Sequence, residues 1–123
     1  MVNIEMQIER FRTGDRMSKS LAHASTVYLS GQMAIKTRGQ SIEYQMTEIL
    51  ILLEEYLNEL KSHKSRLLLV TIWLKDISDI KKMDEIWDKW IAGFGTPARV
   101  VVEANLNSPD CFIEISAIAS RKL

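Results

Sequence analysis

The sequence has few of the residues that mark special classes of protein. Its 123 residues include one cysteine, two prolines and five glycines, and 16 basic side chains balance 16 acidic ones. The lone Cys111 cannot form an internal disulfide, and a free thiol is typical of a reducing compartment, so we expect a cytoplasmic protein. A formal net charge of zero provides no general field for phosphates, which argues against broad nucleic-acid binding.

Long hydrophobic runs are also missing. No stretch approaches the roughly 18 apolar residues of a membrane helix, and the first residues lack a signal-peptide pattern, so we expect no membrane association. Hydrophobic residues make up 46% of the chain and charged residues 26%, a composition typical of a globular protein with a sizeable core. The length is close to the commonest for one domain, so residues 1–123 are expected to form a single domain.

Hydrophobic periodicity predicts the order strand, strand, helix, strand, helix, strand, strand. Alternation over residues 2–9 predicts a strand with one wet face, and residues 26–34 predict a second strand, interrupted at Gly31. A glycine there indicates a bulge, the more frequent reason, or a close approach to the backbone. Residues 16–25 show no clear pattern. Apolar residues three and four positions apart predict helices over 42–60 and 80–91.

The last third of the chain is expected to build a sheet with two covered faces. The apolar run 66–75 is too continuous for a strand with one face in water. Residues 99–106 and 111–119, joined by a turn at 107–110, predict a hairpin. Matching its apolar rows places Val100 and Val102 toward the helices and Arg99, Val101 and Glu114 on the opposite face. Two helices cannot cover both faces, so we expect a second copy of the chain to pack there.

Arg99 is the leading candidate for a functional residue. A guanidinium group among valines is costly unless an anion meets it. One interpretation is an ion pair with Glu103, Glu114 or an acid of a neighbouring subunit. The other is bidentate capture of a small carboxylate, with Glu114 positioning a water.

Several segments carry a family resemblance. They are Leu29-Ser30-Gly31-Gln32, Trp73-Leu74-Lys75-Asp76, Thr96-Pro97-Ala98-Arg99-Val100-Val101-Val102-Glu103-Ala104 and Phe112-Ile113-Glu114-Ile115-Ser116-Ala117-Ile118-Ala119. Together they resemble the RidA (YjgF) family over most of residues 26–121. The resemblance implies an α+β, chorismate-mutase-like fold, a mixed sheet with two helices packed on one face. It also implies a homotrimer whose sheets line a central barrel, with ligand clefts between subunits.

The same resemblance implies a reaction and its residues. Well-studied members hydrolyse 2-imino or enamine acids to 2-oxo acids and ammonia. Arg99 matches the arginine that binds the substrate carboxylate, and Glu114 matches the glutamate that orients the attacking water. Ser30 and Gly31 match a turn that lines the cleft, and the backbone amide near Val101 would complete substrate binding.

Three positions depart from the family pattern. Met17 stands where the deaminases have a tyrosine, Asp84 where they have a cleft asparagine, and Val101 where they have a cysteine. An ionised Asp84 would repel a carboxylate or compete for Arg99, so the usual substrate would bind weakly or not at all. These departures indicate a divergent branch.

Two functions therefore follow as hypotheses. The first is the deaminase. The alternative, favoured by Met17 and Asp84, is a non-catalytic trimer that binds a small carboxylate or regulates a partner. Neither needs a cofactor, and no metal is expected because His23 and His63 lie far apart without a ligand cluster. Ribonuclease activity, attributed to some relatives, is disfavoured by the neutral charge and the lack of a basic aromatic surface.

Overall fold

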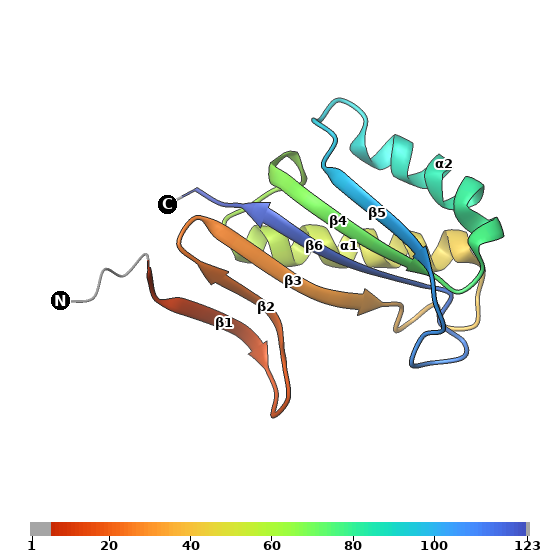
Figure 1. Ribbon diagram of the computed structural model, residues 1–123, viewed down its shortest axis with the longest axis horizontal. Helices are drawn as coiled ribbons and strands as arrows, with labels where there is room; N and C mark the ends of the chain where they lie inside the picture. Colours follow the sequence, from red (N-terminus) through yellow and green to blue (C-terminus); the bar gives the residue numbers. More distant parts are fainter. Residues whose placement is uncertain (1–5, 123) are drawn as a thin grey trace.

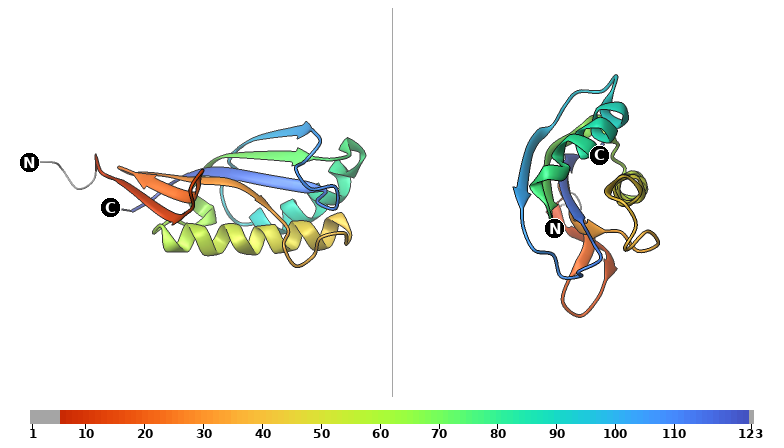
Figure 2. Two further views of the ribbon diagram at one scale, coloured as in Figure 1. Left: turned by 90° about the horizontal axis from the view of Figure 1, so that it is seen from below. Right: turned by 90° about the vertical axis from the view of Figure 1, so that its right-hand side faces the viewer.

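The computed structural model describes residues 6–122, which form a six-stranded sheet with two helices on one side (Figure 1, Figure 2). The elements are β1 (Ile8–Thr13), β2 (Ser18–His23), β3 (Thr26–Met33), α1 (Ile42–Glu59), β4 (Leu67–Leu74), α2 (Ile80–Ile91), β5 (Ala98–Glu103) and β6 (Ile113–Ser120). Short 3₁₀ turns, Lys64–Arg66 and Ile77–Asp79, precede β4 and α2. The strand order is β1-β2-β3-β6-β4-β5, and the β4–β5 pair is parallel. The expected α+β architecture is confirmed.

Both helices form where the apolar spacing predicts them. The hydroxyl of Ser41 caps α1 by accepting a hydrogen bond from the Tyr44 N–H at 3.4 Å. The buried stripe of α1 includes Met46, Ile49 and Leu53, which repeat at the three-and-four spacing of one helical face. The buried residues of α2 are Met83, Trp87 and Ile91. No helix within residues 6–122 is long and apolar enough to cross a membrane.

The N-terminal strands differ from the expectation. Of the strand predicted over residues 2–9, residues 2–5 lie outside the described part of the chain, and β1 begins only at Ile8. The unpatterned segment contains β2, which pairs with both β1 and β3. Its buried face carries Ser20 and Ala22. Small or polar residues at the buried positions hide the apolar alternation by which a strand is recognised.

The predicted hairpin of β5 and β6 is wrong. These strands are not neighbours, because β4 lies between them and pairs with β6 on one side and β5 on the other (Figure 1). The β4–β5 register places Arg99 beside Val70 and Val101 beside Ile72, and both β4 residues are buried. Arg99 and Val101 therefore share the sheet face that the helices cover.

The expected positions of the β5 valines are consequently reversed. Val100 and Val102 are 46% and 40% exposed and belong to the open face, where Glu114 on β6 also lies beside Trp73. Arg99 and Glu114 thus lie on opposite faces of one sheet. The prediction that both faces of β4 are covered holds for this chain on the helix side only. Covering the open face would need another molecule.

Candidate functional site

Arg99 forms an ion pair with Asp84 at the edge of the sheet next to α2. The Nη1 of Arg99 donates a hydrogen bond to the Oδ1 of Asp84 at 2.6 Å. The Cζ of Arg99 lies 5.5 Å from the centroid of the Trp87 ring, within the range of a cation–π contact. Asp84 and Trp87 reach the same guanidinium because they are three positions apart on one helix face.

Asp84 is the acid of this chain that pairs with Arg99. Glu103 accepts a hydrogen bond from the Ile77 N–H at 2.8 Å instead, and Glu114 lies across the sheet. The Arg99 and Asp84 side chains are 27% and 37% exposed, so a pair between them stabilises the fold by about 1 kcal/mol at most. The contact uses Nη1 alone, which leaves the other guanidinium N–H groups for a second acceptor.

Glu114 belongs to a separate cluster on the open face. The β3–β6 register shifts between Leu29 and Gln32, which confirms a bulge at the predicted position. A Cβ built at Gly31 would lie only 2.8 Å from the Cδ of Glu114 and would overlap its carboxylate, so the close approach is also real. A side chain at position 31 would displace the Glu114 carboxylate, so glycine is what allows this carboxylate to lie against the bulge.

The neighbouring Ser30 is held by the next strand. Its hydroxyl donates to the Lys19 carbonyl at 2.9 Å and accepts from the Nε2 of Gln32 at 3.2 Å. These bonds fix the bulge that faces Glu114. They tie the position of the bulge to β2, the strand that the sequence pattern did not predict.

Burial raises the pKa of Glu114 above the ordinary value of a glutamate. Part of the reason is its position on a sheet face between β3 and β4, where water is partly excluded. A carboxyl group with a raised pKa exchanges its proton closer to neutral pH, which suits it to take a proton from water and give it back.

The residues predicted for the site thus fall into two groups that one chain does not unite. Arg99 and Asp84 form the first group, with Val101 on the same face and packed against the core. Ser30, Gly31 and Glu114 form the second. Met17 lies just before β2, is 50% exposed, and accepts a hydrogen bond from the Gly14 N–H at 2.8 Å through its carbonyl.

Trp87 is a site residue that the sequence analysis did not name. It is 5% exposed and belongs to the core, but its ring also lies beside the Arg99 guanidinium. The three-residue spacing from Asp84 was the available signal. It gains meaning only once β5 is known to lie next to α2.

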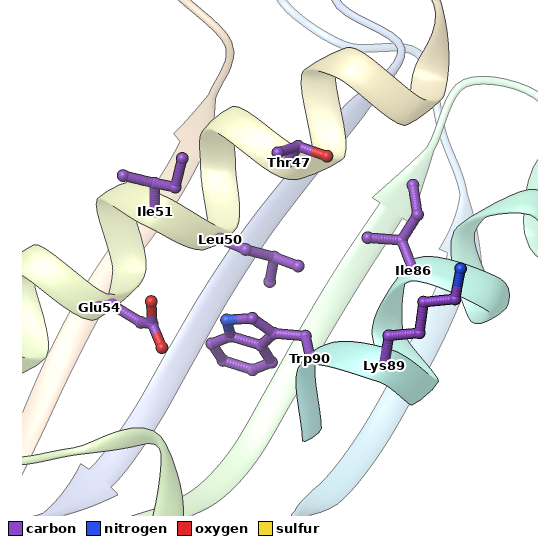
Figure 3. Close-up of a pocket in the computed structure, with 7 residues that line it drawn as sticks. All are labelled: Thr47, Leu50, Ile51, Glu54, Ile86, Lys89 and Trp90. Atoms are coloured by element: carbon purple, nitrogen blue, oxygen red, sulfur yellow. The ribbon is translucent and has the colours of Figure 1, made fainter. Parts of the chain in front are cut away.

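A groove between the two helices is distinct from both groups (Figure 3). It has a volume of about 280 Å³. Its lining residues are Thr47, Leu50, Ile51 and Glu54 of α1 and Ile86, Lys89 and Trp90 of α2. None of the predicted site residues lines it. In the part of the chain from 6 to 122, no group of three or more His, Cys, Asp or Glu residues is placed to hold a metal ion.

Comparisons with known proteins agree on one family. The family model described as endoribonuclease L-PSP matches residues 7–121. A RutC family protein of Haemophilus influenzae is 33% identical over 115 residues, which cover 94% of this chain and 99% of the relative. A crystal structure of a YjgF family member from Neisseria meningitidis superposes with a TM-score of 0.86 at 31% identity, covering 97% of this chain and 98% of the other. An uncharacterized protein from Pseudomonas aeruginosa gives a TM-score of 0.90 at 29% identity, covering 94% and 100%. With the mixed sheet and the glycine bulge already in place, these matches confirm the resemblance: the chain belongs to the RidA (YjgF) family.

Proposed function

We propose that the protein hydrolyses 2-imino or enamine acids to 2-oxo acids and ammonia at a site completed by two copies of the chain. Arg99 of one copy would bind the substrate carboxylate, and Glu114 of the next would orient and activate a water. The observation that carries this proposal is the placement of Arg99 and Glu114 on opposite faces of one sheet. A single copy cannot bring both to one small ligand, so the proposal requires that Arg99 of one copy lie next to Glu114 of another.

Family membership supports a general role in imine or enamine deamination. The reaction needs few catalytic groups. The carbon of a protonated imine, R–C(=NH₂⁺)–COO⁻, is already electrophilic. Water adds to this carbon while Glu114 takes one of its protons, which gives a carbinolamine. Glu114 then returns the proton to nitrogen, the C–N bond breaks, and the hydroxyl proton leaves with ammonia as NH₄⁺. Arg99 holds the carboxylate so that water and imine carbon meet in one orientation.

The remaining parts of the proposal concern the setting of this reaction. The protein would act as a homotrimer in the cytoplasm and would bind neither nucleic acid nor a membrane. Balanced formal charges, 16 basic against 16 acidic, support the statement on nucleic acid. The reaction as written uses no metal and no cofactor.

A second function, a non-catalytic trimer that binds a small carboxylate and regulates a partner, is favoured by one observation. The acid Asp84 already occupies one side of Arg99 at 2.6 Å, so a substrate carboxylate must share the guanidinium with it. Because Asp84 competes for Arg99, such a protein would bind a small carboxylate but hydrolyse 2-imino acids slowly. The two functions differ in turnover and agree on the binding site.

The test generates 2-iminobutyrate in place and follows its loss with semicarbazide as a trap. Wild-type protein should accelerate the loss, and Arg99→Ala and Glu114→Gln should each lower the rate by about 100-fold. Gly31→Ala should also lower it because the new methyl displaces the Glu114 carboxylate, whereas Gly95→Ala, a glycine with open space around it, should not.

Mixing the two inactive variants tests the shared site. In mixed oligomers of Arg99→Ala and Glu114→Gln, about a quarter of the sites combine an intact Arg99 with an intact Glu114. Activity should therefore return in part after subunit exchange. If wild-type protein is no faster than Arg99→Ala, the deaminase is wrong. Retained binding of 2-oxobutyrate would then support the non-catalytic function.

A further inference from the structure

We propose that Asp84 is a specificity-determining residue that makes the Arg99 site select ligands by net charge. The site would accept zwitterionic acids, in which a protonated nitrogen lies next to the carboxylate, and would discriminate against simple anionic acids. This inference rests on the proposed role of Arg99 in binding a carboxylate. It concerns which carboxylates enter, and it is independent of whether they are turned over.

The ion pair supplies the first step. Asp84 contacts the Nη1 of Arg99 at 2.6 Å, and both side chains are partly exposed, at 37% and 27%. The pair is therefore open to a ligand and carries no net charge. A carboxylate that binds the remaining edge of the guanidinium meets the repulsion of the Asp84 carboxylate at close range.

The second step is that Trp87 favours the position in which Arg99 meets Asp84. Its Cζ lies 5.5 Å from the Trp87 ring centroid, and Trp87 is 5% exposed and held in the core. The ring face attracts the cation and limits where the guanidinium can go. Val101, two residues further along β5, packs against the same core, which restrains the strand. The ligand thus meets a cation, an acid and a ring that contact one another.

The third step concerns what relieves the repulsion. Asp84 pairs through Oδ1, and its carboxylate retains further lone pairs that can accept an N–H. A protonated imine or amine on the carbon next to the ligand carboxylate brings both an N–H donor and a positive charge into this region. A 2-oxo acid brings neither. An asparagine in place of Asp84 would remove the distinction, because its side chain is neutral.

This selection has a direct consequence for the proposed reaction. The protonated 2-imino acid has no net charge, while the 2-oxo acid formed from it has a charge of −1. The Arg99–Asp84 pair would therefore bind substrate more tightly than product. Hydrolysis removes the cation that offsets Asp84, so product release is favoured.

The test measures binding of two stable probes by isothermal titration calorimetry. The probes are 2-aminobutyrate, a zwitterion, and 2-oxobutyrate, an anion of the same carbon skeleton. Wild-type protein should bind 2-aminobutyrate about tenfold more tightly than 2-oxobutyrate. Asp84→Asn should reduce this preference by about tenfold, mainly through tighter binding of 2-oxobutyrate. Asp88→Asn removes an exposed acid one turn further along α2 and should leave the preference unchanged.

The outcomes separate this inference from the proposed function. If wild-type protein and Asp84→Asn show the same preference, or if wild-type protein favours 2-oxobutyrate, charge selection by Asp84 is wrong and the role of Arg99 stands. If Arg99→Ala binds both probes as tightly as wild-type protein, Arg99 is not the carboxylate site, and both proposals fall. Absence of binding by either probe to any form also overturns the inference. Should Asp84→Asn fail to fold, Asp84→Ser serves as a second neutral variant.

Discussion

Three carboxylates in this chain are set to different tasks by the groups that each one meets. Glu48 is surrounded by hydrogen-bond donors, which lower its pKa to about 2. Asp84 meets a guanidinium, and the two form an accessible neutral pair. Glu114 is partly buried, and the loss of water raises its pKa. The first is suited to holding structure, the second to selecting a ligand, and the third to exchanging a proton.

Glu48 shows the structural use most clearly. From α1 its carboxylate accepts hydrogen bonds from the N–H groups of Ile35, Lys36 and Thr37 and from the Thr37 hydroxyl, at 2.7–3.2 Å. Desolvation by itself would raise the pKa, but these bonds together outweigh it. One side chain thereby fixes the segment that leaves β3. The sequence did not reveal this role, because a glutamate on a helix surface has the same pattern whether or not it is bonded.

Replacing Glu48 by glutamine should destabilise the protein in a pH-dependent manner. Because the folded pKa, about 2, lies below the ordinary value of 4.5, the carboxylate stabilises the fold above pH 4.5. That stabilisation is lost as the pH falls toward 2. Allowing for solvent screening, Glu48→Gln should lower the free energy of unfolding by about 1–2 kcal/mol at pH 7 and by little near pH 2.

Urea denaturation between pH 2 and pH 7 measures this difference. Glu43→Gln, an exposed glutamate in the first turn of the same helix, is the matched control and should show a smaller, flatter effect. A Glu48→Gln deficit of the same size at both ends of the pH range would show that the negative charge is not responsible.

The helices α1 and α2 and the strands β3, β4 and β6 were predicted to within two residues, whereas β5 ends at Glu103, three residues before its predicted end. The spacing of α1 and α2 is set by which residues touch the sheet, so the pattern and the structure report the same contact. In β2 the buried positions are Ser20 and Ala22, and no pattern results. The order of the strands in the sheet could not be predicted in the same way. Alternation reveals the two faces of a strand but not which strand lies beside it, and for this reason β5 and β6 were paired wrongly.

One buried side chain secures the connection between these two strands. Gln45 of α1 is fully buried, and its Nε2 donates to the carbonyls of Gln40 and Asp110 at 3.1 and 2.9 Å. Its Oε1 accepts from the Phe112 N–H at 2.8 Å. The amide therefore holds the start of α1 against the loop that leads into β6.

Gln45→Leu should lower the free energy of unfolding by about 2–4 kcal/mol, because it leaves several buried backbone groups without partners. Urea denaturation at pH 7 measures the loss. Gln40→Leu makes the same substitution at an exposed position whose contribution comes from its backbone carbonyl, and it should cost much less. Equal losses in the two variants would show that the Gln45 amide bonds contribute little.

The molecule as a whole has one covered and one open sheet face, and under the proposed function this asymmetry makes activity depend on assembly. Both helices lie on one side (Figure 2). On the other side Tyr28, Val100 and Val102 are 41%, 46% and 40% exposed. The family resemblance proposes the candidate site residues one by one. Their division between the two faces was not predictable, because it depends on β4 lying between β5 and β6. Arg99 and Glu114 can therefore act together only if copies of the chain pack side by side.

Assembly and activity should accordingly fail together when the open face is given a charge. Wild-type protein should sediment as a trimer, and Val102→Asp should shift it toward the monomer, because a carboxylate would be buried without a partner where two copies meet. Imine hydrolysis should fall with the trimer fraction, although Arg99 and Glu114 are both intact. Ile51→Asp places the same charge on α1 at a side chain that is 52% exposed, and it should leave both trimer and rate unchanged. Sedimentation velocity measures the first quantity and the imine assay the second. If wild-type protein is a monomer, or if Val102→Asp is a monomer with full activity, packing of copies on the open face does not bring Arg99 of one copy to Glu114 of another, and the shared site is wrong.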